Sequence, residues 1–160
     1  MNFRSSLKFR FILFFNAIIL FFSLIISVTT YQKSISLVVM TYAKQGEAIA
    51  KKAYREMPKD KLEKIMKKIQ QSKGNKKEAK NIAQDPDFRE LQKILSDLRK
   101  DYGLKYLYTM VELKKGTYAY AIDGSEGPDL PGTVEEIFYP ELDATFKTKK
   151  PHIGQITNDK

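Results

Sequence analysis

The 160-residue sequence contains no cysteine and only one histidine, His152. Without cysteine the chain has no disulfide framework, no thiolate metal site and no cysteine nucleophile, and it is compatible with any redox compartment. It also contains no HExxH pair and no glycine-rich phosphate loop, which are the usual apparatus for metal-dependent hydrolysis and phosphoryl transfer. These absences predict a non-catalytic protein without a metal or other cofactor. We expect His152, which follows Pro151 in a loop, to lie at the surface.

Charge is absent from one long stretch near the N-terminus. Residues 11–32 form 22 consecutive positions without a charged side chain, and 15 of the first 18 are apolar. A helix of this length reaches about 33 Å, enough to cross about 30 Å of hydrocarbon. A cleaved signal peptide is the alternative, but its apolar region normally spans only about 7 to 15 residues before a small-residue cleavage site. The sequence therefore predicts an uncleaved transmembrane helix over 11–32.

The basic residues before this stretch predict its orientation. Arg4, Lys8 and Arg10 precede it with no acidic residue among them. Such an excess of positive charge favours a cytoplasmic N-terminus. We therefore expect a single-pass protein of the cell membrane, with a cytoplasmic segment over 1–10 and an extracytoplasmic domain over 33–160.

The net charge of +9 is unevenly distributed along the chain. Residues 44–80 contain 13 basic and five acidic side chains, whereas residues 101–146 contain three basic and nine acidic ones. A basic stretch can bind nucleic acid, but an extracytoplasmic location argues against that partner. The remaining interpretations are a solvated helical face or contact with anionic lipid headgroups or wall polymers. The acidic region would attract a cationic or zwitterionic ligand more readily than a simple anion.

Apolar spacing predicts that the membrane helix continues into the domain. From Tyr31 onward, apolar residues recur at intervals of four, three, four and seven. This pattern marks one face of a helix, which either packs on its own domain or forms the seam of a homodimer. The Met57-Pro58 pair is expected to end the helix. The residues on this face are Tyr31, Ile35, Val38, Tyr42 and Ile49.

Two further helices are predicted from capping signals and spacing. Asp60 and Glu63 form an acidic variant of the capping box ahead of a short amphipathic helix. Residues 72–81 carry turn residues and lysines without an aliphatic stripe, so they are expected to form a loop. Asp85 is a suitable N-cap for a third helix that begins with Pro86, and a left-handed glycine at Gly103 would end it.

Beyond Gly103 the period changes from about 3.6 to 2. Residues 105–113 and 117–123 are rich in β-branched and aromatic side chains, and the lysines and glycine between them predict a β-hairpin turn. Helices followed by strands indicate the α+β class. The rest of the chain is expected to form an irregular loop (124–132), a segment with a short helix (134–146) and the start of another strand (153–157).

The register of this hairpin decides which side chains share a face. A turn with an even number of residues pairs Leu113 with Tyr118 and Val111 with Tyr120, whereas a three-residue turn shifts the register by one and redistributes the tyrosines. In the even register, the helix-packing face carries Leu107, Val111, Leu113, Tyr118, Tyr120 and Ile122. The opposite face carries Tyr106, Tyr108, Met110, Ala119, Ala121 and Asp123. Aromatic rings, small residues and one carboxylate are typical of a small polar-ligand pocket, although each tyrosine could instead be a core or rim residue.

Several short strings carry a resemblance to a known family. They are DYGLKYLYTM at 101–110, YAID at 120–123, and PHIG at 151–154 after a loop rich in glycine and proline. Together with the N-terminal membrane helix, this order resembles the extracytoplasmic Cache (PAS-like) sensor domains of bacterial transmembrane receptors. Those receptors include methyl-accepting chemotaxis proteins, sensor histidine kinases and diguanylate cyclases.

The resemblance implies an antiparallel sheet packed against the long helix, with a small molecule on the other side of the sheet. The ligands of such domains are amino acids, carboxylates or amines. Carried onto this sequence, it favours Tyr108, Tyr120 and Asp123 as pocket residues, with Asp129 or His152 on the covering loops. Combined with the hairpin pattern, the expected ligand-binding residues are Tyr106, Tyr108, Met110, Tyr120, Asp123 and Asp129.

We therefore expect a non-catalytic small-molecule sensing module used in chemotaxis or signal transduction. Ligand binding would order the loop 124–132 and shift the long helix relative to the membrane. Receptors of this kind have further strands, a second membrane span and an output domain, so we expect an incomplete sheet in a receptor fragment or a degenerate copy. The alternative is a membrane-anchored interaction or scaffold protein whose basic helical region binds anionic lipid, wall polymer or a partner protein.

Overall fold

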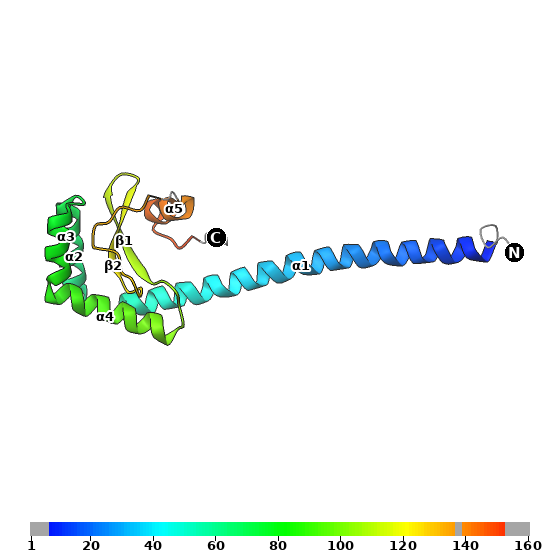
Figure 1. Cartoon of the computed structure of the whole chain (residues 1–160), viewed down its shortest axis with the longest axis horizontal. Coiled ribbons are helices and arrows are strands. Elements are labelled where there is room, and N and C mark those ends of the chain that lie inside the picture. The colour runs from blue at the N-terminus through cyan, green and yellow to red at the C-terminus, as the bar shows by residue number, and fades with distance from the viewer. Residues whose placement is uncertain (1–6, 137–138, 153–160) are drawn as a thin grey trace. The chain divides into compact units, whose positions relative to one another are not determined.

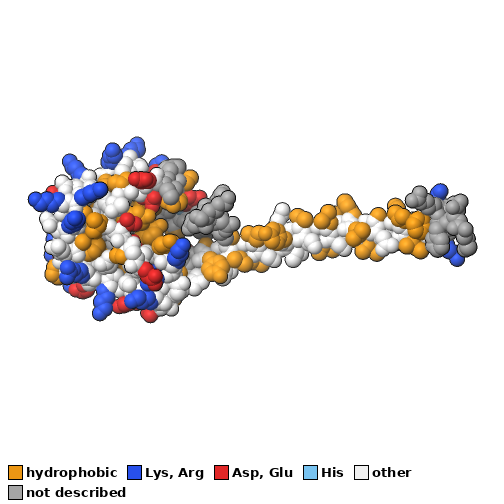
Figure 2. All heavy atoms as spheres, viewed as in Figure 1, with side chains coloured by type: hydrophobic (Ala, Val, Ile, Leu, Met, Phe, Trp, Pro, Cys, Tyr) orange, Lys and Arg blue, Asp and Glu red, His pale blue; other side chains and the backbone are white. Residues whose placement is uncertain are grey.

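The computed structural model describes residues 7–136 and 139–152 and divides the chain into two compact units, 1–44 and 45–160. One helix, α1 (Leu7–Glu56), includes all of the uncharged stretch (Figure 1). Its apolar part is long enough to cross a membrane, and none of the side chains in that part is buried. Figure 2 shows these side chains as a run of hydrophobic surface along the helix. The expected continuous helix is confirmed, and its placement in a membrane remains a prediction.

The apolar face predicted along α1 has two different environments. Tyr31, Ile35, Val38 and Tyr42 are exposed, whereas Ile49 is only 2% exposed. Ala53 and Met57, which follow Ile49 at helical spacing, belong to the core of the second unit. The later part of the face therefore packs on its own domain, and the earlier part is uncovered in the single chain.

The second helix, α2 (Lys59–Ser72), follows the break at Met57-Pro58 as expected. Its N-cap is Pro58, in an extended conformation, and no side chain caps the helix by a hydrogen bond within the described structure. The expected capping box is therefore wrong, because the helix starts one residue before Asp60. The Asp60 carboxylate lies in the first turn instead, where it interacts favourably with the helix dipole.

A helix occupies much of the stretch expected to be a loop. α3 (Lys76–Gln84) is capped by Asn75, whose side-chain oxygen accepts hydrogen bonds from the backbone N–H groups of Lys77 and Glu78. Only Ala79 and Ile82 of this helix are buried. Because only two of its nine residues are buried, α3 has no aliphatic stripe at helical spacing. A prediction from apolar spacing therefore misses this helix.

The signals for the next helix are confirmed. α4 (Pro86–Asp101) begins with proline, and the Asp85 carboxylate accepts a 2.9 Å hydrogen bond from the backbone N–H of Asp87. Gly103 has a φ of +61°. The backbone N–H of Leu104, the next residue, donates to the carbonyl of Arg99 in the last turn of α4. This left-handed residue turns the chain out of the helix toward the sheet.

The sheet is an antiparallel hairpin of β1 (Tyr108–Lys114) and β2 (Thr117–Asp123), joined by Lys115 and Gly116. The segment 132–135 lies along the other edge of β2: the N–H of Tyr120 donates to the carbonyl of Thr133, and Ala119 forms a bridge with Val134. Strand β2 is therefore paired on both edges. A short helix, α5 (Pro140–Thr148), follows. The expected strand at 153–157 lies outside the described residues.

The expected register is wrong, although the turn has an even number of residues. Glu112 pairs with Tyr118 and Met110 with Tyr120, because a β-bulge at Leu113 adds one residue to β1 next to the turn. A second irregularity at Ala121 restores the alignment of Thr109 with Ile122. Tyr118 and Tyr120 therefore do not join the core formed with α2, α3 and α4, as was expected of them. Ala119 and Ala121 join the hydrophobic core in their place.

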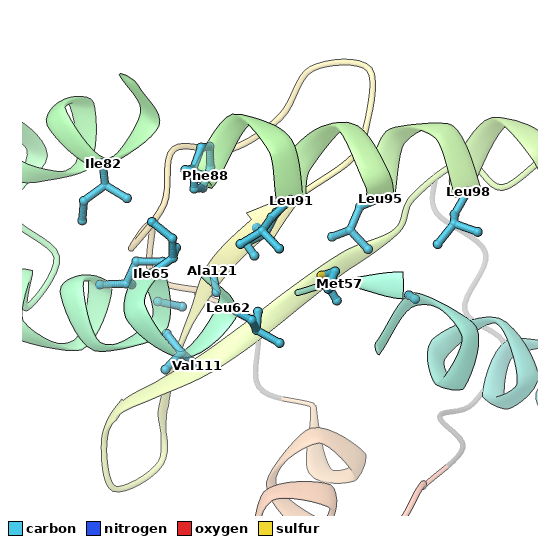
Figure 3. Packing of buried hydrophobic residues seen from close by; sticks show 14 residues of the cluster. Met57, Leu62, Ile65, Ile82, Phe88, Leu91, Leu95, Leu98, Val111 and Ala121 are labelled. Carbon is cyan, nitrogen blue, oxygen red and sulfur yellow. The ribbon is translucent and has the colours of Figure 1, made fainter. Parts of the chain in front are cut away.

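The core lies between the sheet and the helices α2, α3 and α4. Figure 3 shows Leu91, Leu95 and Leu98 of α4 directed toward Met57, Leu62 and the strands. Burying a side chain of this size contributes about 1.5 to 3 kcal/mol, so these helices fix the inner face of the hairpin. In Figure 1 the hairpin lies between α2 and α3 on one side and α5 on the other. The fold is α+β, as expected, and its outer sheet face is left for other contacts. The fully buried large side chains include Ile65, Ile69, Phe88, Leu91, Leu95 and Ile122.

Candidate functional site

The outer face of the hairpin gathers three tyrosines and a methionine. Tyr108 and Met110 alternate along β1, and Tyr118 and Tyr120 alternate along β2, so the pleat directs all four away from the helical core. The rings of Tyr108 and Tyr120 meet edge to face, with centroids 5.0 Å apart. This contact joins the two strands across the face that does not pack on helices.

Helix α5 covers one end of this face. Leu142 and Phe146 are four residues apart and share a side of the helix. The Phe146 ring lies against Tyr118, with centroids 4.7 Å apart. The Tyr118 hydroxyl donates a 2.8 Å hydrogen bond to Asp143, which also pairs with Lys147. One aromatic contact and one charge-assisted hydrogen bond therefore connect α5 to β2.

A cavity of about 310 Å³ remains between the hairpin and α5. We refer to it as the outer-face cavity. Its volume lies at the lower end of the range for small-molecule sites, about 300 to 1,000 Å³. Its walls are mostly aromatic and apolar, which suits a compact organic molecule. The lining residues are Tyr108, Met110, Tyr139, Leu142 and Phe146.

Acidic side chains lie beside this aromatic surface. The Tyr120 hydroxyl donates to the Glu135 carboxylate, and the Tyr118 hydroxyl donates to Asp143. Lys147 and then Tyr118 hold the pKa of Asp143 below its usual value. Burial raises the pKa of Tyr108, and the nearby Tyr139 and Glu135 raise it further. At neutral pH the site therefore presents uncharged phenols next to carboxylates, an environment that favours a cationic or zwitterionic ligand.

We expect the tyrosines to titrate in separate groups. Burial, followed by the hydrogen bond to Asp143, raises the pKa of Tyr118 to about 12, whereas an unperturbed tyrosine titrates near 10. Because its pKa is raised in the folded state, the uncharged Tyr118 hydroxyl stabilises the fold. This stabilisation is complete below pH 10 and is lost as the pH rises toward 12. Burial and the hydrogen bond to Glu135 also raise the pKa of Tyr120. Tyrosinate absorbance should therefore show Tyr118 and Tyr120 ionising after the exposed tyrosines, and Tyr118→Phe should reduce the amplitude of that late step. A single transition near pH 10 for all nine tyrosines would contradict this environment.

The expected binding residues do not all meet at the cavity. Tyr108 and Met110 line it, and Tyr120 lies against Tyr108. Tyr106 is exposed and carries the Lys105 ammonium 4.9 Å above its ring, and it does not line the cavity. Asp129 is exposed on the loop that follows β2. The strands therefore bring together three of the six expected residues.

Asp123 is buried and holds the loop that follows β2. Its two carboxylate oxygens accept 2.9 Å hydrogen bonds from the backbone N–H groups of Ser125 and Asp129. Its backbone carbonyl accepts a hydrogen bond from the Gln92 side chain on α4, and Arg99 donates to the carbonyl of Gly124. These bonds fix the loop from within the fold, so we do not retain the expectation that a ligand orders it.

Sequence reasoning missed the residues supplied by the segment after the loop. Two signals were available: Pro140 at the start of a helix, and Leu142 and Phe146 at helical spacing. Neither signal shows that the helix returns to the outer face of the hairpin. The residues missed are Glu135, Tyr139, Leu142, Asp143 and Phe146.

The basic stretch 44–80 is partly neutralised within the fold. Lys61, Lys64 and Lys68 of α2 form ion pairs with Glu90, Asp87 and Asp85 at the start of α4. Such surface pairs contribute little stability, but they remove these lysines from the charge available to an anionic surface. The interpretation as a solvated helical face is favoured for this part of α2.

Among the described residues, no group of three or more histidine or carboxylate side chains could hold a metal ion. His152 is exposed, with its ring Nε2 2.8 Å from the Thr148 hydroxyl. Comparison with protein-family models, curated proteins and solved structures found no match to this chain.

Proposed function

We propose that this chain is a membrane-anchored, non-catalytic sensor module that binds a small amine or amino acid in the outer-face cavity. The observation that carries the proposal is the aromatic-lined cavity between the hairpin and α5, on the sheet face opposite the helical core. This placement agrees with what the resemblance to Cache domains implies. The proposal includes a PAS-like relationship for the domain, a membrane span over 11–32 and a cytoplasmic N-terminus.

The chemistry of the cavity favours a cationic or zwitterionic ligand over a simple carboxylate. The faces of tyrosine and phenylalanine rings attract ammonium groups, by about 0.5 to 2 kcal/mol for each favourable contact. Tyr108 and Tyr139 supply such rings, and Glu135 and Asp143 supply negative charge nearby.

The binding test uses the full chain in nanodiscs of zwitterionic lipid. Isothermal titration against α-amino acids, alkyl amines and simple carboxylates should detect binding in the first two classes. Tyr108→Ala should weaken that binding about tenfold or more, a loss of about 1.4 kcal/mol. Tyr106→Ala is the matched control, since this neighbouring tyrosine does not line the cavity. A folded chain that binds none of these classes, or equal losses in both variants, would remove the basis of the proposal.

A further inference from the structure

A second and larger concave surface borders the same side of α5, and Phe146 lines both this surface and the outer-face cavity. It is a groove of about 1060 Å³ between the C-terminal part of α1 and the end of α5, within the unit 45–160. We refer to it as the α1–α5 groove. Its lining residues are Glu47, Ala50, Lys51, Tyr54, Arg55, Thr145, Phe146, Lys149, Lys150 and Pro151.

The groove uses a face of α1 that the core leaves open. Ala50 and Tyr54 are four residues apart and lie on one side of the helix. Ile49 and Ala53, one position earlier in each turn, are buried in the domain. Tyr54 remains 58% exposed although it is a large aromatic residue. This part of α1 therefore packs by one face and presents an adjacent apolar face to the groove.

Basic side chains border this apolar floor. Lys51 and Arg55 lie on α1, and Lys149 and Lys150 lie at the end of α5. Among the described lining residues Glu47 is the one acid, and it pairs with Lys51 at 2.6 Å. The Lys149 ammonium lies 5.6 Å from the centre of the Phe146 ring, at the junction of the apolar floor and the basic rim. The groove thus combines an apolar floor with a net positive rim.

This combination discriminates between possible occupants. A second copy of the chain would bring the same positive rim into a two-fold interface, where like charges repel. An extended peptide would bury backbone N–H and C=O groups against helices whose own backbone groups are already paired. An aliphatic tail has no such groups, and an anionic head matches the lysines and arginine. Charge and polarity together favour a single-chain anionic amphiphile.

We propose that the α1–α5 groove binds a long-chain fatty acid. Its tail lies along Ala50, Tyr54 and Phe146, and its carboxylate lies among Lys51, Arg55 and the two lysines that follow α5, Lys149 and Lys150. Charge-assisted hydrogen bonds from lysine and arginine would hold the carboxylate, and burial of the tail would supply most of the affinity. This site shares Phe146 with the outer-face cavity, but its other lining residues are different and its ligand has the opposite charge, so its test does not depend on the proposed sensor function.

The absence of tryptophan from the chain gives a direct test. Tyr54→Trp places a single indole in the groove at an exposed aromatic position. The full chain in zwitterionic nanodiscs is titrated with a fatty acid brominated on its tail, which quenches a nearby indole. We expect saturable quenching that weakens about tenfold or more when Lys149 and Lys150 are both replaced by glutamate. Replacing Lys76 and Lys77 by glutamate makes the same charge change on α3 and should leave the affinity within about twofold.

Several outcomes would overturn the assignment. A Tyr106→Trp chain places the indole outside the groove, so equal quenching of the two probes would show that the groove does not bind the fatty acid. Equal quenching by the brominated methyl ester would show that the carboxylate is not recognised. An emission change that depends on protein concentration alone would assign the groove to a second copy. A response to polyglutamate but not to the fatty acid would assign it to an acidic peptide.

Discussion

The Gly124→Ala chain is expected to lose about 3 kcal/mol of its free energy of unfolding, because the new side chain would overlap the backbone of α4. A Cβ on Gly124 would lie 2.7 Å from both the carbonyl carbon of Leu95 and the amide nitrogen of Ser96. Backbone atoms inside a helix cannot move aside as the end of a flexible side chain can. The loop must therefore separate from α4, or α4 must shift in the core.

Two hydrogen bonds would be strained by that separation. The backbone N–H of Gly124 donates to the carbonyl of Leu107, and its carbonyl accepts from the buried Arg99 side chain. Urea unfolding of the full chain in nanodiscs, followed by tyrosine fluorescence, would measure the loss as a lower midpoint. Gly127→Ala in the same loop is the control, since a Cβ added to Gly127 would meet no heavy atom of the described residues within 4 Å. Equal midpoints for the two variants would contradict close packing at Gly124.

Helices whose ends are defined by nearby capping residues could be predicted from the sequence. Asp85, Pro86 and Gly103 define both ends of α4 through bonds within a few residues of each terminus, so their signals do not depend on the rest of the fold. The length of α1 follows equally from uninterrupted apolar spacing. Helix α3 was missed because its stability comes from one local cap and two buried side chains.

The hairpin shows where sequence reasoning ends. Alternation along each strand is local, and it correctly put Tyr108 and Met110 on one face. The relation between the strands depends on the bulge at Leu113, which no turn rule reveals. That single extra residue moved Tyr118 and Tyr120 to the outer face and Ala119 and Ala121 into the core. The expected register therefore put Tyr118 and Tyr120 on the wrong side of the sheet, and three of the five cavity-lining residues, Tyr139, Leu142 and Phe146, were not found.

The cover of the cavity was beyond prediction for a different reason. Phe146 meets Tyr118 across 28 positions of sequence, and Asp143 bonds to the same tyrosine. Contacts of this kind depend on how a loop returns the chain, which local periodicity does not encode. For Asp123 the sequence led to the opposite error, because it predicted a carboxylate free to bind a ligand. In the folded chain both carboxylate oxygens accept hydrogen bonds from the loop that follows, and these contacts cannot be read from the sequence.

The Asp123→Asn chain is expected to lose about 2 to 3 kcal/mol of stability, because one of two charge-assisted hydrogen bonds to the loop is lost. The carboxylate accepts from Ser125 and from Asp129 through different oxygens. An asparagine offers one oxygen and one NH₂ group, so one of these backbone donors would face another donor. Asp123 is only 5% exposed, which prevents water from replacing the missing acceptor easily.

The same variant separates a structural carboxylate from a ligand-binding one. We expect Asp123→Asn to lower the urea midpoint while the affinity of the folded chain for an amine ligand stays within about twofold of the parent. Asp129→Asn is the matched control: this exposed side chain should change stability by less than about 0.5 kcal/mol, because Asp129 contributes its backbone N–H to the contact. If Asp123→Asn instead abolished binding at an unchanged midpoint, the carboxylate would have to leave the loop and contact the ligand. The bonds that hold the loop to Asp123 would then describe only the resting arrangement of the site.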